Sequence, residues 1–187
     1  MKVICISGKA GSGKDTVAEI LQQELINFYG DGVVHVLIIH YADLLKHILK
    51  SYFNWDGKKD ERGREMLQKI GTNVVRKADE NFWVDFVAKF LKIFDPIWDI
   101  AVIPDARFAN EIDVLSAKGF NVFAIRVSRS ENPSQLTSEQ KTHESETALD
   151  NYKFDAQIDN DGTIEELREK VKQVVHDWHL SLQKERG

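Results

Sequence analysis

The fold is decided by one stretch of the sequence, Gly8-Lys9-Ala10-Gly11-Ser12-Gly13-Lys14-Asp15-Thr16. A short apolar run comes before this stretch, and apolar residues at helical spacing follow it. In a glycine-rich loop between a strand and a helix, backbone N–H groups point inward, and the positive N-terminal end of the helix adds to their attraction for anions. The stretch therefore predicts a P-loop, whose residues are all candidate contacts to the phosphates of ATP.

The two residues after the glycines suggest how charge is handled in this loop. Lys14 stands where a P-loop lysine neutralises the β- and γ-phosphates. Asp15 replaces the Ser or Thr expected next, and Thr16 follows one position later. Because an isolated carboxylate would repel phosphate, we expect Asp15 to face Mg²⁺, water or a cation. ATP and Mg²⁺ are the predicted cofactors, with Asp15, Thr16 and Asp105 as the candidate metal ligands.

The composition is that of a globular protein rather than a fibrous, disordered or membrane protein. Of 187 residues, 42% are hydrophobic, and the formal net charge of −5 argues against a nucleic-acid polymer as partner. No apolar run approaches the ~18 residues of a membrane helix, so we expect no membrane association. A single cysteine, Cys5, excludes an internal disulfide and a zinc cluster and favours the reducing cytoplasm. Both a monomer and a homodimer remain open.

Apolar runs and helical patterns alternate along the chain, which is typical of βαβ units and a mostly parallel sheet. The runs that predict strands are Val3 to Ile6, Val33 to Ile39, Ile100 to Ile103, Val122 to Val127 and Phe154 to Ile158. We therefore expect an α/β P-loop NTPase fold with a five-stranded, mostly parallel sheet flanked by helices. The single domain of residues 1–187 is predicted to consist of a core (1–40, 96–127 and 151–187), a helical insertion (41–95) and a lid-like connection (128–150).

Two of the helical patterns predict which residues of their helices are buried. One apolar stripe is predicted at Leu67, Ile70 and Val74. The other belongs to the last helix, where Thr163 and Glu166 form a capping-box pattern ahead of it. Its predicted stripe is Ile164, Leu167, Val171, Val174 and Trp178.

Charge is distributed unevenly along the chain. From Lys46 to Lys77 there are nine basic residues against four acidic ones, so this segment carries +5 and the rest of the chain −10. Such a segment is either a solvated helix face with alternating ion pairs or a docking surface for a small anion. Its place between the second and third predicted strands is where kinases of small phosphorylated acceptors bind the acceptor.

Other classes of P-loop protein lack support in the sequence. A GTPase would carry a base-reading Asn-Lys-x-Asp, and the nearest segment, Tyr152-Lys153-Phe154-Asp155, has Tyr in place of Asn. A motor or recombinase would carry a catalytic Glu beside its Walker-B Asp. The candidate here, Asp105, is followed by Ala106 and Arg107, and a cation suits a substrate phosphate better than a hydrolytic water.

The sequence resembles the P-loop nucleoside monophosphate kinases, and most closely the bacteriophage-type deoxynucleoside monophosphate kinases. The more particular matches are the block from Gln68 to Arg76 and the block from Asp105 through Arg107 to Glu111. The segments that carry the resemblance are Gly8 to Thr16, Tyr41 to Lys46, Leu67 to Thr72 with Arg76, Phe82 to Val84, Ile103 to Glu111 and His143 to Glu146.

The resemblance implies the reaction ATP + (d)NMP → ADP + (d)NDP and a role for each matching residue. The implied acceptor-binding residues are Asp43, Lys46, Arg64, Gln68, Thr72, Arg76, Trp83, Asp105 and Arg107. For some of these a structural role is the alternative: Trp83 either stacks on the base or belongs to the core, and Arg64 is either a phosphate ligand or a surface partner of the acidic residues Glu61 and Glu65. The Asp105–Arg107 pair either serves the phosphates or is a strand-end salt bridge that caps the following helix.

Four residues are predicted to act on the transferring phosphoryl group: Lys14, Arg107, Arg126 and Arg129. Arg126 and Arg129 are included because Ser130 to Asp150, the greater part of the lid-like connection, contains no arginine. The positive charge expected of a lid would then have to come from these two residues at the end of the fourth predicted strand. Two alternatives to the nucleotide kinase remain. One is a kinase of another small phosphorylated metabolite, such as phosphomevalonate or dephospho-coenzyme A, and the other is a regulatory module that hydrolyses nucleotide slowly.

Overall fold

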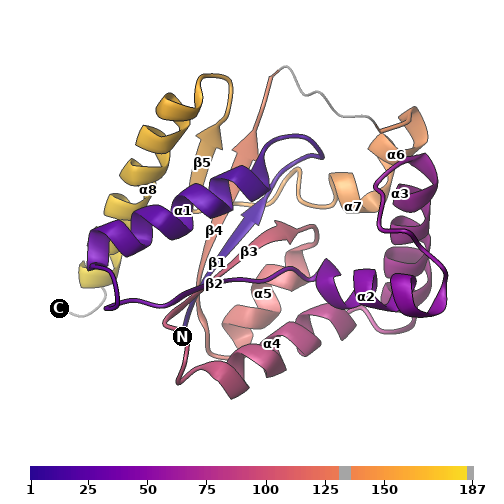
Figure 1. Ribbon diagram of the computed structural model, residues 1–187, viewed down its shortest axis with the longest axis horizontal. Coiled ribbons are helices and arrows are strands. Elements are labelled where there is room, and N and C mark those ends of the chain that lie inside the picture. The colour runs from indigo at the N-terminus through magenta and orange to yellow at the C-terminus, as the bar shows by residue number, and fades with distance from the viewer. Residues whose placement is uncertain (131–135, 185–187) are drawn as a thin grey trace.

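The computed structural model describes residues 1–130 and 136–184, which form a parallel sheet covered by helices on both faces (Figure 1). The sheet order is β2-β3-β1-β4-β5, and every pair of neighbouring strands is parallel. The prediction of five strands in a parallel sheet is confirmed. The strands are β1 (Lys2–Ser7), β2 (Val36–Ile38), β3 (Ile100–Ala106), β4 (Asn121–Ser128) and β5 (Ala156–Asp159).

Two of the predicted strands begin later than expected. Val33 was predicted to open the second strand but is 69% exposed, because residues 31–33 form a turn in which Gly32 has φ +73. The fifth strand begins at Ala156 rather than Phe154, because Asp155 lies in a bend and its carboxylate accepts a hydrogen bond from the Ala124 N–H.

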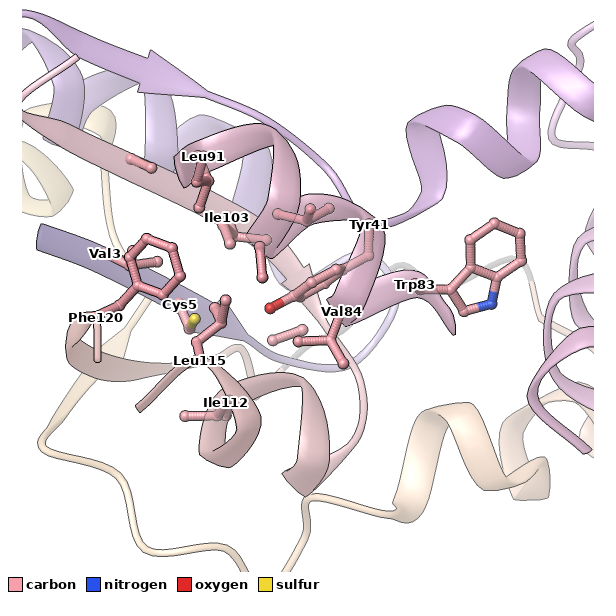
Figure 2. Packing of buried hydrophobic residues seen from close by; sticks show 14 of the residues in the cluster. Val3, Cys5, Tyr41, Trp83, Val84, Leu91, Ile103, Ile112, Leu115 and Phe120 are labelled. Carbon is pink, nitrogen blue, oxygen red and sulfur yellow. The ribbon is translucent and has the colours of Figure 1, made fainter. Parts of the chain in front are cut away.

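The alternation of side chains along β1 builds two separate cores. Ile4 and Ile6 pack under α1 (Lys14–Tyr29) and α8 (Ile164–Lys184). Val3 and Cys5 point to the opposite face, under α4 (Phe82–Phe94) and α5 (Ala109–Ala117), as Figure 2 shows for Cys5 beside Ile103, Leu115 and Phe120. Because β1 lies in the middle of the sheet, Cys5 is fully buried, paired with Ile103 on β3 and Ala124 on β4.

The last helix is capped as predicted, but its buried stripe is shifted. The Thr163 N–H donates to the Glu166 carboxylate, and the Glu166 N–H donates to the Thr163 hydroxyl, which confirms the capping box. Ile164 lies in the first turn and is 49% exposed, and Val175 rather than Val174 is buried. The buried stripe is Leu167, Val171, Val175 and Trp178.

The helical insertion between β2 and β3 contains four helical segments. They are α2 (Ala42–Tyr52), α3 (Glu61–Gln68), the π-helix η1 (Lys69–Arg76) and α4. The wider turn of η1 changes which residues face inward, since a π-helix bonds residues five apart. Ile70 and Val75 pack against the core and Val74 is 51% exposed, so the prediction of Val74 as part of the buried stripe is wrong.

Two short helices lie in the predicted lid-like connection. They are α6 (Ser138–Thr142) and α7 (Glu144–Thr147), and residues 131–135 of the connection lie outside the described residues. In Figure 1, α6 lies next to α3, while α7 lies between α6 and the strands. Gln68 of α3 donates to the Gln140 carbonyl, and Gln140 donates to the Glu61 carbonyl, so α6 is tied to the insertion. Among the described helices, none is long and apolar enough to cross a membrane.

Candidate active site

A cavity of about 370 Å³ lies between the P-loop, the ends of β2 and β3, the insertion and α7. This is the carboxyl edge of the sheet, where parallel α/β proteins bind their ligands. Of the predicted acceptor residues, all but Asp43 contribute to its wall: Lys46, Arg64, Gln68, Thr72, Arg76, Trp83, Asp105 and Arg107. Of the predicted ATP contacts, Ala10, Gly11, Lys14 and Asp15 contribute as well.

The P-loop conformation requires its glycines. Gly11 and Gly13 have φ values of +82 and +92, which disfavour any side chain. A Cβ at Gly13 would also lie 2.3 Å from the Asn160 amide nitrogen, which donates to the Ser12 carbonyl at 2.9 Å. The loop is therefore held from outside by the segment that follows β5. The Ser12 hydroxyl is buried and has no hydrogen-bond partner among the described residues.

Lys14 is buried at the start of α1, and its ammonium group turns back onto the loop. Its Nζ donates to the Gly8 carbonyl at 2.8 Å and to the Lys9 carbonyl at 2.9 Å. Burial, followed by the nearby charge of Arg107, lowers the pKa of Lys14 to about 7. A phosphate beside this group would favour its charged form. The protonation state of Lys14 therefore depends on whether a phosphate is bound.

Arg76 is fixed in the cavity wall by three neighbours. Its Nη2 donates to the Asn110 side chain at 2.6 Å, and its guanidinium carbon lies 3.6 Å from the centre of the Phe108 ring. Glu111 Oε1 lies 3.6 Å from Nη1, which is close enough for an ion pair but too far for a hydrogen bond. Nη1 is buried and lacks a hydrogen-bond partner within the described parts of the chain, so it is an unsatisfied donor that solvent does not reach.

Glu111 organises the start of α5, and sequence reasoning assigned it no role. Its carboxylate accepts from the Arg107 N–H at 2.6 Å and from the Phe108 N–H at 3.2 Å. Burial raises the pKa of Glu111 to about 7, although these two donors and Arg76 act in the opposite direction. Glu111 stands at the third helical position, where a capping-box Glu belongs, but the N-cap is Phe108 rather than Ser or Thr, so the sequence carried only half of the signal.

Asp105 anchors the insertion to the sheet. One carboxylate oxygen accepts from the Tyr41 N–H at 2.9 Å and the other from the Ala42 N–H at 3.0 Å, at the start of α2. Asp105 thus caps a helix, but it is α2 rather than the helix that follows it in sequence. Both oxygens already accept hydrogen bonds from backbone N–H groups, so the structure gives no support to the prediction that Asp105 binds Mg²⁺.

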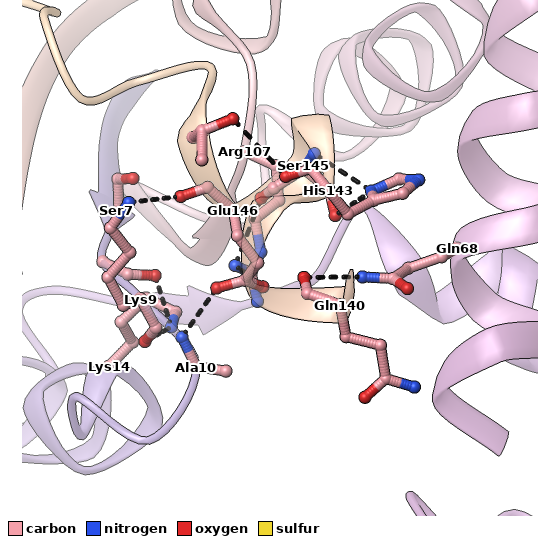
Figure 3. Close-up of polar contacts among 12 residues, drawn as sticks. Ser7, Lys9, Ala10, Lys14, Gln68, Arg107, Gln140, His143, Ser145 and Glu146 are labelled. Carbon is pink, nitrogen blue, oxygen red and sulfur yellow. Dashed lines mark hydrogen bonds and ion pairs between the residues drawn. The ribbon is translucent and has the colours of Figure 1, made fainter. Parts of the chain in front are cut away.

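Arg107 contacts α7. Its Nη1 lies 2.5 Å from Glu146 Oε1 and 3.3 Å from the Ser145 carbonyl oxygen (Figure 3). The other carboxylate oxygen of Glu146 accepts from the Ala10 N–H of the P-loop at 2.9 Å. Glu146 belongs to a matched segment, but nothing in the spacing indicated that it would meet both residues.

A chain of polar groups connects the P-loop to α2. Asp15 Oδ1 lies 3.3 Å from His40 Nε2, and His40 Nδ1 lies 3.4 Å from Asp43 Oδ2. Asp43 in turn pairs with Lys46 at 2.9 Å. The hydrogen bond between Asp15 and His40 lowers the pKa of Asp15 and raises that of His40. Sequence reasoning missed His40, which lies just after β2 without any motif of its own.

The candidate metal ligands are not gathered into one cluster. The described residues contain no group of three His, Cys, Asp or Glu side chains arranged to hold a metal ion. Asp15 lies in the cavity wall, whereas Thr16 is exposed at the start of α1 and does not line the cavity. Asp15 is therefore the candidate ligand that the geometry favours.

The predicted lid arginines lie away from the cavity. Arg126 donates to the Ser7 hydroxyl at 3.2 Å and to Asp150 at 3.0 Å, and Asp150 also holds Lys9 of the P-loop at 2.6 Å. Arg129 is exposed after the end of β4. Neither contributes to the cavity wall.

Trp83 is packed as a core residue. Its side chain is buried between α4 and η1, with the indole N–H donating to the Gly71 carbonyl at 3.0 Å. Figure 2 shows it on the insertion side of Tyr41 and Val84. Although Trp83 contributes to the cavity wall, it is only 5% exposed, so the arrangement favours the core alternative over stacking on a base.

The amino-acid sequence matches the model of one known protein family. Residues 34–171 match the family described as Deoxynucleotide monophosphate kinase. The chain belongs to this family. Membership confirms the resemblance to the phage-type kinases and the predicted class of phosphotransferase acting on nucleoside monophosphates.

Two relatives illustrate the match in sequence. The chain is 33% identical over 172 residues to "Uncharacterized protein ORF77" of Ictalurid herpesvirus 1 (strain Auburn), a match that covers 90% of this chain and 68% of that protein. It is 34% identical over 114 residues to the deoxynucleotide monophosphate kinase of Enterobacteria phage T4, covering 60% of this chain. The matched part spans only 44% of the phage enzyme's length.

A solved structure supports the fold. Thymidylate kinase from Ehrlichia chaffeensis aligns with a TM-score of 0.52 at 16% identity, covering 93% of this chain and 98% of the other. The prediction of a P-loop kinase fold is thereby confirmed.

Proposed function

We propose that the chain transfers the γ-phosphoryl group of ATP to a deoxynucleoside monophosphate. An oxygen of the acceptor's 5′-phosphate attacks the γ-phosphorus, and the bond from that phosphorus to the bridging oxygen of the leaving ADP breaks. The observation that carries the proposal is that residues of the P-loop and the side chain of Arg76 line the same cavity of about 370 Å³. Donor and acceptor phosphates can therefore meet inside it.

On the donor side, the P-loop amides and Lys14 bind the phosphates of ATP. Mg²⁺, when bound, offsets charge on the β- and γ-phosphates. It is commonly held by one or two carboxylates together with phosphate oxygens and water, so a single carboxylate at Asp15 fits this chemistry. The hydrogen bond from His40 keeps Asp15 ionised and fixes its direction.

On the acceptor side, Arg76 binds the 5′-phosphate through its fork, because a guanidinium offers two parallel donors to a phosphate. Gln68 and Thr72 contact the sugar or base, and Arg64 and Lys46 add positive charge to the same wall. This role supports reading the basic segment of the insertion as a docking surface for a small anion.

Arg107 lies between the two substrates and stabilises charge on the transferring group. Catalysis of this kind depends on positioning and charge neutralisation rather than on covalent chemistry by the protein. A role for Arg126 or Arg129 would require each to move, Arg126 by leaving Asp150. The protein would work in the reducing cytoplasm as a monomer or a homodimer.

A coupled assay of ADP release tests the proposal. Deoxynucleoside and ribonucleoside monophosphates, phosphomevalonate and dephospho-coenzyme A are each supplied with ATP and Mg²⁺. We expect acceptor-dependent ADP release with deoxynucleoside monophosphates, and its loss in Arg76→Ala. ADP release that needs no acceptor would instead identify a hydrolysing regulatory module, and turnover of the other acceptors alone would identify a different metabolite kinase.

A further inference from the structure

Glu146 occupies an unusual position for a carboxylate in a phosphate-binding site. Its side chain is only 6% exposed, and its two oxygens face two different donors (Figure 3). Oε2 accepts from the Ala10 N–H at 2.9 Å, and Oε1 lies 2.5 Å from Arg107 Nη1. The Glu146 backbone carbonyl also accepts from Lys9 Nζ at 2.7 Å.

These contacts are made with groups that would otherwise serve phosphate. Ala10 belongs to the loop whose N–H groups bind phosphate oxygens, and Arg107 is the cation between the two substrates. A carboxylate that bridges an amide and a guanidinium makes the same kind of charge-assisted hydrogen bonds as a phosphate. Two anions at van der Waals distance repel each other strongly in a buried site, so Glu146 and a phosphate cannot use these donors together.

The position of Glu146 is built by its surroundings. His143 Nδ1 accepts from the Ser145 N–H at 3.2 Å and so caps the short helix α7, and Arg107 contacts the Ser145 carbonyl as well as Glu146. Four residues after Glu146, Asp150 pairs with Lys9 at 2.6 Å. The P-loop therefore holds this segment at two points, one of which is the phosphate-binding amide.

We propose that Glu146 is a positioning residue that competes with a nucleotide phosphate for the Ala10 N–H and Arg107. This inference rests on the proposed function. Binding of ATP displaces the carboxylate, and Arg107 exchanges Glu146 for a phosphate oxygen. Part of the binding free energy is spent on that exchange, so the affinity for nucleotide is lower than the P-loop alone would give. Asp150 keeps α7 attached to Lys9 while Glu146 moves away.

Isothermal titration with a non-hydrolysable ATP analogue and Mg²⁺ tests the competition. The proteins are the wild type, Glu146→Gln and a matched control, Glu144→Gln, which removes the same charge from an exposed position on the same helix. Because the apparent Kd is inversely proportional to the fraction of binding-competent protein, and Glu146→Gln should raise that fraction, the variant should bind about three- to tenfold more tightly than the wild type. The control should bind like the wild type. Loss of a contact that merely stabilises the fold would not tighten binding.

A second pair of variants shows whether the effect passes through Arg107. In an Arg107→Ala background, Glu146→Gln should gain less affinity, because one of the two shared donors is gone. Unchanged or weaker binding by Glu146→Gln, in a protein that melts like the wild type, would overturn the competition and leave the proposed function standing. An equal gain in Glu144→Gln would overturn it too, because the effect would then be one of general charge. If neither the wild type nor any variant bound nucleotide, both proposals would be wrong.

Discussion

Lys14 is the side chain on which the proposed transfer depends most directly. Replacing it by Ala removes a buried cation from the phosphate site, and the hydrogen bonds it makes to the described residues go to two loop carbonyls, at Gly8 and Lys9. We expect Lys14→Ala to fold normally and to lose roughly 10²–10³-fold in kcat, the size of effect seen when one preorganised donor is removed. Steady-state kinetics and a melting curve check this, with exposed Lys172→Ala as control. Near-normal turnover would remove the P-loop from the mechanism.

The lowered pKa of Lys14 makes nucleotide binding pH-dependent. Lysine is a base, so a pKa of about 7 means that its charge disappears as pH rises above 7 in the free protein. A bound phosphate restores the charge, so binding takes up a proton, and affinity for ATP should fall by up to about tenfold per pH unit above pH 7.

Calorimetry in buffers of different ionisation enthalpy measures this proton uptake. Lys14→Arg is the matched control, because a guanidinium stays charged across the whole range. If the ATP affinity of Lys14→Arg fell with pH as steeply as that of the wild type, the proton taken up on binding would belong to another group.

Arg76 should act on the acceptor alone. Its side chain lines the cavity and its Nη1 has no hydrogen-bond partner among the described residues, while Asn110 and Phe108 hold the rest of the guanidinium. We expect Arg76→Ala to lower kcat/KM for the deoxynucleotide by at least about tenfold, or 1.4 kcal/mol, with the Kd for ATP unchanged. Steady-state kinetics measure kcat/KM for the deoxynucleotide, and titration measures the Kd for ATP. Lys77→Ala, at an exposed position, serves as the control. A weakened ATP affinity with normal acceptor KM would place Arg76 on the wrong side of the site.

At the scale of elements, Asp105 connects β3 to α2 and so sets the position of one wall of the cavity. Asn at this position offers only one oxygen to the two N–H groups of Tyr41 and Ala42. Loss of a capping interaction costs about 1 kcal/mol, which for a domain of this size lowers Tm by about 2–4 °C. We therefore expect a lower Tm for Asp105→Asn by calorimetry. An unchanged Tm with lost activity would instead favour the predicted role at the phosphates.

The elements that the sequence predicted well are those set by local pattern. The P-loop, the buried strands and the capping box at Thr163 each depend on residues close together in the chain. Val33 and Val74 were misplaced for equally local reasons, a turn at Gly32 and the π-helical turn of η1, which shift the boundaries of an apolar pattern without removing it. The role of Asp105 at the start of α2 could not be predicted in this way, because β3 and α2 lie far apart in sequence.

At the scale of the whole molecule, the site combines predictable and unpredictable parts. Most of the predicted acceptor residues line one cavity because their segments follow neighbouring strands at the same sheet edge. Glu146 and His40 were missed because their roles depend on partners in other segments. Glu111 caps its own helix, but the residue at the N-cap is Phe108, which is not a usual capping residue. Arg126 contacts Ser7, which directly precedes the P-loop, yet its hydrogen bonds to Ser7 and Asp150 leave it outside the cavity wall. Strand-end position predicts which edge a residue reaches, but not the side to which it turns.

The burial of Cys5 makes the rate of its chemical labelling a measure of how often the sheet opens. It is the chain's single thiol, it sits between two hydrogen-bonded strands, and burial raises its pKa well above the ordinary range. A thiol reagent can therefore react only when the centre of the sheet opens, so labelling should be slow in the native protein and accelerate with denaturant in step with unfolding. Mass spectrometry would count a single added label per chain. ATP should slow the reaction further if it binds only the folded form, whereas rapid labelling without denaturant would mean that β1 opens independently of the rest of the sheet.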